Sequence, residues 1–480
     1  MPSPFSLAAY VGPRGTVRLF GAVAALVLAT GGCGALADTR SEAHGTAAHG
    51  IAAQRAAPPV DAPDDASDDG RADGPADTSA DTLGDGSGDT RAANPERREA
   101  GDANPGWQGG TRGFPMLPED RITFAQMTDN RRVDTSRTAS EVGFVWGGSA
   151  PHGRAIGSYY YPMDRDLDRS HTADWYAGNA PDRIVYKCDR TTPAPLFTYA
   201  WGAYAPIDTT NPAVRDYILE RYIAPALRSG HKVIALDNVS LRNGGRRCGV
   251  YRNGQWVQLF SGEGKDPVYE QAVMDWVKWL ADAIHARGGL LALNASVVPE
   301  DAAKTRRLIA LGDIWLEEAG TSRGCTQRVS DDVWRAKFEA ARWAAQRMAW
   351  VALEKTCAFP DDIGDDEAQW IVGNFLLARG PQSYLGAVKN GVRIPELRYP
   401  PNLNPRVGAP AGPAEEVPGG GWVRPFRRGL VLVNPSSTAT MRYRLADGQW
   451  AALDEQPVSA EVLVPPTSAR ILLRLDLDRH

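Results

Sequence analysis

Four apolar segments of the sequence each end on a carboxylate or an amide side chain. The residues at these ends are Asp237 with Asn238, Asn294, Glu317 with Glu318, and Glu354, in the segments 232–241, 289–296, 312–320 and 348–356. Turn chemistry explains any single one, since Asp and Asn readily hydrogen-bond their own backbone. It explains the set poorly, because Glu is not a favoured turn residue. The repeated pattern indicates carboxylates gathered for acid–base or nucleophilic chemistry.

The segments alternate with amphipathic helical patterns that can position these side chains. One helix is predicted to begin with Asn211 as N-cap and Pro212, and to end at Gly230. Two further helices are expected, from Asp266 to Gly288 and after Asp331. Strands that alternate with helices predict a parallel sheet, and in a (β/α)₈ TIM barrel all strand ends converge around one pocket. We therefore predict an α/β fold with a TIM barrel over residues 115–400.

The composition of the N-terminal part of the chain predicts a targeting signal followed by a disordered tether. Residues 1–37 are predicted to be an export signal, because the apolar run 19–29 follows two arginines and is too short to span a bilayer. Cleavage is expected either before Cys33, which would then be lipidated, or after "ALA" (35–37). Residues 38–110 are rich in Asp, Ala, Gly and Pro, and are expected to be a disordered tether.

The C-terminal part changes to a two-residue period. Residues 401–421 are rich in Pro and Gly and are predicted to be a linker. Residues 422–480 read as short strands joined by turns, which predicts a small antiparallel β-module.

The ordered part of the chain resembles bacterial TIM-barrel glycoside hydrolases of the hypothetical glycosyl hydrolase family 15 kind. It is more distantly similar to endo-α-1,4-polygalactosaminidase-like enzymes. The motifs that carry the resemblance are "DTTNPAVRDY" (208–217), "ALDNVS", "LALNAS", "LEEAG" and "RGLVLVNPSS", over roughly residues 120–475. The resemblance implies that an Asp ending the fourth strand and a Glu ending a later strand are catalytic.

These positions are Asp237, expected to be the nucleophile or base, and Glu317, expected to be the acid, with Glu318 as its rival. Adjacent strand residues point to opposite faces, so one of the two glutamates is expected to face the pocket. The side chains predicted to contact the sugar are Asn238, Asn294, Trp146, Tyr161, Arg165, Trp201, Asp208, Trp256 and Glu354. The predicted function is hydrolysis of an extracellular poly- or oligosaccharide. The alternative is a non-catalytic carbohydrate-binding surface lipoprotein on a degenerate barrel.

The cysteines predict two disulfide bonds. Setting Cys33 aside leaves four cysteines, and export would place them in an oxidising compartment. Loops after neighbouring barrel strands lie side by side, so we predict the pairs Cys188–Cys248 and Cys325–Cys357, with four buried free thiols as the alternative.

Other chemistries find no support in the sequence. There is no G-x-S-x-G motif for an α/β-hydrolase serine and no H-E-x-x-H motif for zinc. Residues 61–90 contain ten aspartates and one arginine, a net charge of −9, so the other residues of this chain of net charge −5 sum to only +4. A body so close to neutral has no basic footprint for nucleic acid. We expect no cofactor, no metal and no nucleic-acid partner. The expected protein is an exported monomer, whether a cell-surface lipoprotein, periplasmic or secreted, and its only expected membrane contact is the lipid on Cys33.

Overall fold

The computed structural model describes residues 111–127, 142–147, 155–168, 170–195, 205–318, 320–322, 328–356, 362–389 and 401–475. The predicted signal and tether, Cys33, Trp201, Cys325 and Cys357 lie outside these residues. In the part of the chain that is described, no helix combines the length and the hydropathy needed to cross a bilayer.

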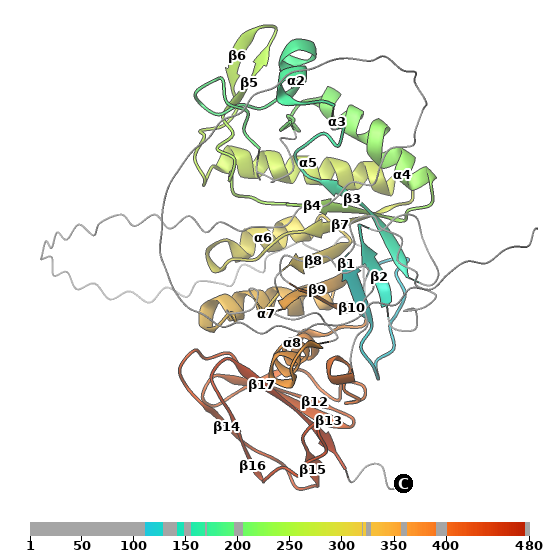
Figure 1. Cartoon of the computed structure of the whole chain (residues 1–480), viewed down its shortest axis with the longest axis vertical. Helices are drawn as coiled ribbons and strands as arrows, with labels where there is room; N and C mark the ends of the chain where they lie inside the picture. The colour runs from blue at the N-terminus through green and yellow to red at the C-terminus, as the bar shows by residue number, and fades with distance from the viewer. Residues whose placement is uncertain are drawn as a thin grey trace, which may run out of the picture. The chain divides into compact units, whose positions relative to one another are not determined.

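Eight parallel strands close into a barrel, which confirms the predicted fold class (Figure 1). Each strand is hydrogen-bonded to its two neighbours in the order β1-β10-β9-β8-β7-β4-β3-β2, and β1 pairs with β2 to close the ring. The strands are β1 (Phe124–Met127), β2 (Val142–Trp146), β3 (Ile156–Pro162), β4 (Val233–Asp237), β7 (Leu290–Asn294), β8 (Ile314–Glu318), β9 (Ala349–Thr356) and β10 (Ser383–Lys389).

Alternating strand residues divide the barrel into two cores. In β4, Val233 and Ala235 belong to the cluster that fills the barrel interior. Ile234 and Leu236 belong to the cluster between the barrel and its helices. Because both faces are buried, the strands are continuous apolar runs, as parallel strands covered on both sides require.

The helices that cover the barrel begin where the sequence predicts. Asn211 caps α3 (Pro212–Ile218) by accepting from Ala213 N, and Asp266 caps α5 (Pro267–His285) by accepting from two backbone N–H groups. In Figure 1, α5, α6, α7 and α8 follow one another beside β7, β8 and β9. The other helical segments are α2 (Ala173–Asn179), η1 (Pro181–Arg183), η2 (Leu219–Ile223), α4 (Ala224–Arg228), η3 (Pro299–Asp301), α6 (Ala302–Ile309), α7 (Asp331–Ala345), α8 (Asp365–Ala378) and η6 (Pro401–Leu403).

The helix predicted from Pro212 to Gly230 is interrupted. A π-helical segment, η2, separates α3 from α4 and ends two residues before Pro225, the second residue of α4. Proline has no N–H to donate and its ring clashes with the carbonyl four residues earlier, which favours such a shift in the hydrogen-bond pattern.

The C-terminal residues form the predicted antiparallel β-module. Its main sheet has the order β11-β12-β13-β17-β15, and β14 pairs separately with β16. The strands are β11 (Glu415–Val417), β12 (Gly421–Phe426), β13 (Gly429–Asn434), β14 (Met441–Arg444), β15 (Trp450–Ala451), β16 (Glu461–Val464) and β17 (Ser468–Arg474).

The segment 401–421, predicted to be a linker, is part of the folded structure, because its first residues pack on α8 and its last residues pair with the β-module. Leu403 is buried in η6, which contacts α8, and the carbonyl of Val407 accepts from Arg428 N of the β-module. The side chain of Asn404 accepts a hydrogen bond from Ile122 N, at the entry to the first barrel strand. Pro and Gly here shape an irregular buried segment, a use that composition alone does not distinguish from a free linker.

A half-buried arginine joins the β-module to the last barrel helix. The Arg424 guanidinium, on β12, donates to the carbonyls of Leu376, Leu377 and Arg379 at 2.7, 3.1 and 2.9 Å. These carbonyls lie at the C-terminal end of α8, where they have no partner within the helix. Burial lowers the pKa of Arg424 to about 10. The side chain therefore stays charged at neutral pH and complements the negative end of the helix.

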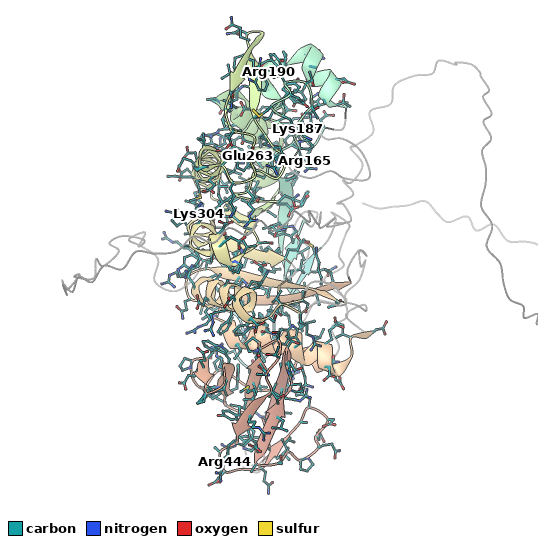
Figure 2. The ribbon with its side chains drawn as sticks, turned by 90° about the vertical axis from the view of Figure 1, so that its left-hand side faces the viewer. Arg165, Lys187, Arg190, Glu263, Lys304 and Arg444 are labelled. Atoms are coloured by element: carbon teal, nitrogen blue, oxygen red, sulfur yellow. A yellow bond between two sulfur atoms is a disulfide. The ribbon has the colours of Figure 1, made fainter. Side chains whose placement is uncertain are left out.

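This contact predicts that the β-module and the barrel share their stability. Arg424→Met should lower the free energy of unfolding by about 3 kcal/mol, because buried carbonyls lose a charged donor. Arg444→Met is the matched control, since Arg444 is an exposed arginine on β14 of the same module (Figure 2). Chemical denaturation of both variants measures the difference. Equal stabilities would show that the guanidinium contributes nothing to the junction.

Candidate active site

Polar side chains occupy adjacent inward positions at the carboxyl ends of four barrel strands. Asp237 has the same parity as Val233 and Ala235, whose side chains fill the barrel interior. By the same alternation, the residues that point inward at the ends of β7, β8 and β9 are Asn294, Glu318 and Lys355. The convergence predicted from the sequence is therefore present.

A continuous chain of polar contacts crosses these strands. Tyr160, on β3, donates through its hydroxyl to Asp237 Oδ2 at 2.9 Å. Asn294 Nδ2 donates to Asp237 Oδ1 and to Glu318 Oε2, each at 2.7 Å. Lys355 Nζ lies 3.3 Å from Glu318 Oε1. We call these five residues the polar arc.

The other side of the barrel mouth is apolar. Val388 on β10, Met127 on β1 and Trp146 on β2 pack with the cluster that fills the barrel interior. They belong to the three strands that complete the ring between β9 and β3. We call these three residues the apolar arc. One side of the mouth therefore carries hydrogen-bonding groups and the other carries apolar side chains, of which Trp146 is fully buried.

Asn294 fixes how far apart the two carboxylates lie. Both oxygens lie 2.7 Å from the same nitrogen, so they are separated by no more than twice that distance. An amide nitrogen has two N–H groups, and each carboxylate takes one of them. The spacing is therefore set by a single planar group on the strand between them.

Glu317, the preferred acid in the sequence-based assignment, points away from this site. Its carboxylate pairs with Lys337 of α7 and accepts from Val297 N at 3.2 Å. Burial raises the pKa of Glu317, and the Lys337 ammonium opposes that shift. The expectation that the two adjacent glutamates face opposite ways agrees with this placement, and it is Glu318 that faces Asp237.

Glu354 is also directed outward and holds a loop. Its carboxylate accepts from the backbone N–H groups of Thr321 and Ser322 at 2.9 Å, just after β8. Burial raises the pKa of Glu354, and these donors oppose the shift. Gly320 has φ +20°, and a Cβ there would collide with the carboxylate, so the loop depends on glycine at this point. Glu354 thus supports the wall beside Glu318 and does not face the barrel interior.

Three other predicted sugar contacts are held by structural partners. Tyr161 points outward and donates to Arg165 O at 2.7 Å, and burial raises its pKa well above the ordinary value. The Arg165 guanidinium contacts the buried carboxylate of Asp164 at 3.3 Å. Asp208 is buried, accepts from Thr210 N and pairs with Arg252. These side chains shape the loops behind the site and do not join the polar arc.

Trp256 lies on a hairpin, β5 (Gly249–Arg252) with β6 (Gln255–Gln258), inserted between β4 and α5. Its ring packs over Gly249, and the Arg190 guanidinium carbon lies 5.6 Å from its centroid. Asn238 follows Asp237 in a left-handed conformation with φ 58°, which turns the chain out of the strand. Of the predicted sugar contacts in the described residues, Asn294 and Trp146 point into the barrel.

The sequence-based prediction missed Tyr160 and Lys355. Both were detectable from strand parity, because Lys355 alternates in register with Val351 and Leu353. Glu354, the carboxylate of this segment, was among the predicted site residues, and the adjacent lysine was not. Tyr160 stands beside Tyr161 in a run of three tyrosines, where only the direction of each side chain separates their roles.

The predicted disulfide Cys188–Cys248 is confirmed, with Cα atoms 5.0 Å apart. It joins the long segments that follow β3 and β4. The buried pair of Arg247 with Asp164, at 2.5 Å, connects the same two segments. Gly262 has φ +81°, and a Cβ there would lie 2.6 Å from Cys188 Sγ, so glycine is required against the bond. The segment that follows Asp237 is thereby anchored to its neighbour.

Among the described residues, no group of three or more His, Cys, Asp or Glu side chains could hold a metal ion. The polar arc has two carboxylates, but its remaining members are an amide, a phenol and an ammonium. Two carboxylates held side by side are groups that can act as an acid and a nucleophile.

Comparison with known proteins gives distant structural similarity only. No family model matches the chain, and no curated protein matches its sequence. A GH31 dextranase from Flavobacterium johnsoniae is similar at 10% identity with a TM-score of 0.42, over 75% of this chain and 52% of the dextranase. The chain thus spans about half the length of that enzyme.

Two other solved structures are similar over most of their own length. A GH27 β-L-arabinopyranosidase from Geobacillus stearothermophilus has 9% identity and a TM-score of 0.40, over 74% of this chain and 96% of that one. The trehalose-6-phosphate hydrolase of Bacillus licheniformis has 8% identity and a TM-score of 0.42, over 74% and 99%. These proteins are named as enzymes that act on sugars, but likeness at this level assigns no activity to the present chain.

Proposed function

We propose that the protein is a glycoside hydrolase in which Asp237 and Glu318 are the two catalytic carboxylates. The observation that carries the proposal is the bond of one amide nitrogen, Asn294 Nδ2, to both carboxylates. Retaining glycosidases hold their carboxyl groups about 5–5.5 Å apart, and inverting ones about 6.5–9.5 Å apart. The nearest oxygens of the two groups are at most twice 2.7 Å apart, which is below the inverting range and supports the retaining class.

The two side chains suit different roles. Asp237 is short, lies on a strand, and is fixed at both oxygens by Tyr160 and Asn294. A fixed and ionised carboxylate is what attack on an anomeric carbon requires. Glu318 is one methylene longer, and its side chain is 17% exposed, so it can reach a leaving group nearer the opening. We assign Asp237 as the nucleophile and Glu318 as the acid and base.

The reaction then proceeds in two balanced steps. Asp237 forms a bond to the anomeric carbon while the glycosidic C–O bond breaks, and the proton of Glu318 moves to the leaving oxygen. Water next attacks the same carbon, its proton goes to Glu318, and the bond to Asp237 breaks. Both residues return to their starting states. Asn294 and Tyr160 act as positioning residues throughout.

The two arcs support a sugar as the ligand. A pyranose ring has C–H-rich faces and hydroxyl groups around its edge, and aromatic rings stack against such faces. The apolar arc offers hydrocarbon surface at Met127 and Val388, which are partly exposed, and the polar arc offers donors and acceptors for the edge. A ligand that is apolar on one side and polar at its edge fits this division.

We further propose that the protein is exported. The apolar run 19–29 and the small residues that follow it support an export signal, with Cys33 as the lipid site of a surface lipoprotein. The bond between Cys188 and Cys248 supports an oxidising compartment, since disulfides are rare in the cytosol.

Asp237→Asn tests the nucleophile. The amide is isosteric but cannot form the covalent bond, so kcat/KM should fall at least about 10³-fold while the melting temperature changes little. A screen of extracellular polysaccharides for new reducing ends identifies the substrate, and the variant is then measured on it. Asp275→Asn, at an exposed position of α5, is the matched control. Full activity in Asp237→Asn would reject the assignment, and binding without cleavage by the wild type would favour a lectin.

Glu317→Gln and Glu318→Gln separate structure from chemistry. Glu318→Gln should lose activity and keep its stability. Glu317→Gln should keep its activity and lose about 3 kcal/mol of unfolding free energy, because Lys337 is left buried without its counter-charge. Kinetics combined with chemical denaturation distinguishes them. The opposite pattern would return Glu317 to the role of acid.

The carboxylate spacing predicts the stereochemistry. Proton NMR of the first product formed should show the anomeric configuration of the substrate, since two displacements restore it. Formation of the opposite anomer would mean that Asp237 and Glu318 do not act as the proposed pair.

A further inference from the structure

A guanidinium lies over an indole at the β5–β6 hairpin. The guanidinium carbon of Arg190 is 5.6 Å from the ring centroid of Trp256, within the range of a cation–π contact. Arg190 is exposed and Trp256 is partly exposed. A second cation, Lys187, precedes Arg190 in the same turn, and Figure 2 shows both cations in the part of the molecule that carries the hairpin. We call Arg190, Lys187 and Trp256 the cationic platform.

The backbone around Arg190 is held in place by the hairpin. The hydroxyl of Tyr251, the residue paired with Trp256 across the hairpin, donates to Arg190 O at 3.0 Å. At the start of the turn, Tyr186 N donates to Gly249 O at 2.8 Å, and the disulfide adds a covalent link. Arg190 has φ 67°, a left-handed conformation that glycine adopts without strain. The geometry of the turn therefore does not explain the arginine.

The two cations of the platform have no counter-charge in the described part of the chain. Neither the Arg190 guanidinium nor the Lys187 ammonium forms an ion pair or a hydrogen bond there. Asp189 lies between them in the sequence, but its carboxylate accepts from Thr191 N and Thr192 N at 2.9 and 2.8 Å and so shapes the turn. Two cations thus stand against one carboxylate that is engaged elsewhere.

The neighbouring arginines are committed to carboxylates, which sets Arg190 apart. Arg252, on the same hairpin, pairs with the buried Asp208, and Arg246 pairs with Glu263 at 3.0 Å. Arg190 is instead oriented by the indole. Stacking uses the face of the guanidinium and leaves the N–H groups at its edge. Such an edge binds a carboxylate or a sulfate through two parallel, charge-assisted hydrogen bonds.

The platform belongs to the loops that surround the barrel mouth. Its turn follows β3, and its hairpin follows β4, the strand that ends on Asp237. In a TIM barrel, loops after the strands form the face on which ligands bind. A polymer with one unit in the mouth must continue over these loops. The exposed side chain of Gln255, on the hairpin, adds an amide that can bind hydroxyl groups.

We propose that the cationic platform binds the carboxylate or sulfate groups of an acidic polysaccharide, at units beyond those that occupy the mouth. The edge of Arg190 binds the anion, Lys187 adds a second charge, and Trp256 fixes the plane of the guanidinium. The choice of a glycan rests on the proposed function, because that function brings a polymer to the mouth. The rival occupant is the acidic segment 61–90 of this chain, which has ten aspartates and one arginine.

Calorimetric titration of the full chain tests the site. Asp237→Asn is used so that no glycan is cleaved during the measurement. One probe is an oligosaccharide of galacturonic acid, compared with the same chain after reduction of its carboxyl groups. Another is a sulfated galactose oligosaccharide, compared with its desulfated form. We expect at least one acidic chain to bind about 10-fold more tightly than its neutral counterpart, because it forms charge-assisted hydrogen bonds. The chain that does so identifies the anion.

Substitutions in the platform show whether it carries the preference. Arg190→Met should reduce the preference to about 2-fold, because the forked donor is lost. Arg190→Lys should restore only part of it, since an ammonium cannot form two parallel hydrogen bonds. Trp256→Leu should weaken binding of the acidic chain, because the guanidinium loses its orientation. Arg444→Met is the control, because it removes an exposed arginine of the β-module (Figure 2), and it should leave the preference unchanged. Melting temperatures confirm that each variant is folded.

The outcomes separate this inference from the proposed function. Equal binding of acidic and neutral chains, no binding of either acidic chain, or a preference that survives Arg190→Met would overturn it. A wild type that cleaves a glycan would then still be a hydrolase. A synthetic peptide of residues 61–90 is the third probe, and its tighter, Arg190-dependent binding would assign the platform to that segment and reject the glycan. An Arg190-dependent preference for an acidic chain that the wild type never cleaves would retain the site and count against the hydrolase.

Discussion

Two carboxylates can share the mouth of this barrel because the amide of Asn294 donates to both of them. Without that bridge, the two carboxyl groups would have no common donor to hold them at this distance. Each carboxylate also has an outer partner, a phenol for Asp237 and an ammonium for Glu318. The five groups belong to five neighbouring strands, so the closed sheet sets their order. In a network of this kind, removal of one member changes the others, and the effects of single substitutions do not add.

Much of this arrangement follows from properties that a sequence displays. Apolar runs between capped helices predict the barrel, and polar residues at the ends of the runs mark its functional face. The disulfide between Cys188 and Cys248 follows from the same reasoning, since loops after adjacent strands are neighbours. Position along the strand was therefore predictable. The direction of each side chain required one further step, the parity of every strand counted from its buried residues.

That step separates the inward from the outward residues. Counting from Ile314 and Leu316 places Glu318 inside the barrel and Glu317 outside it. The same count on β9 places Lys355 inside the barrel and Glu354 outside it. The partners of the outward residues could not be predicted, because they depend on tertiary contacts. Lys337 meets Glu317 only when α7 packs on the barrel, and Arg424 reaches α8 from a module nearly fifty residues later in the chain.

The outward residue at the end of β8, Glu317, and the inward residue, Glu318, contact different parts of the protein. Glu317 is buried, and its charge is tolerable only because Lys337 balances it. Lys337 belongs to α7, whose neighbouring residue Phe338 packs against Trp422 of the β-module with ring centroids 4.7 Å apart. The strand end is thus fixed from behind by a helix that the β-module in turn supports. Glu318, on the opposite face, is left to contact Asn294 and Lys355. A rigid support behind a reactive side chain is what precise positioning requires, so under the proposed mechanism Glu317 serves the scaffold and Glu318 serves the chemistry.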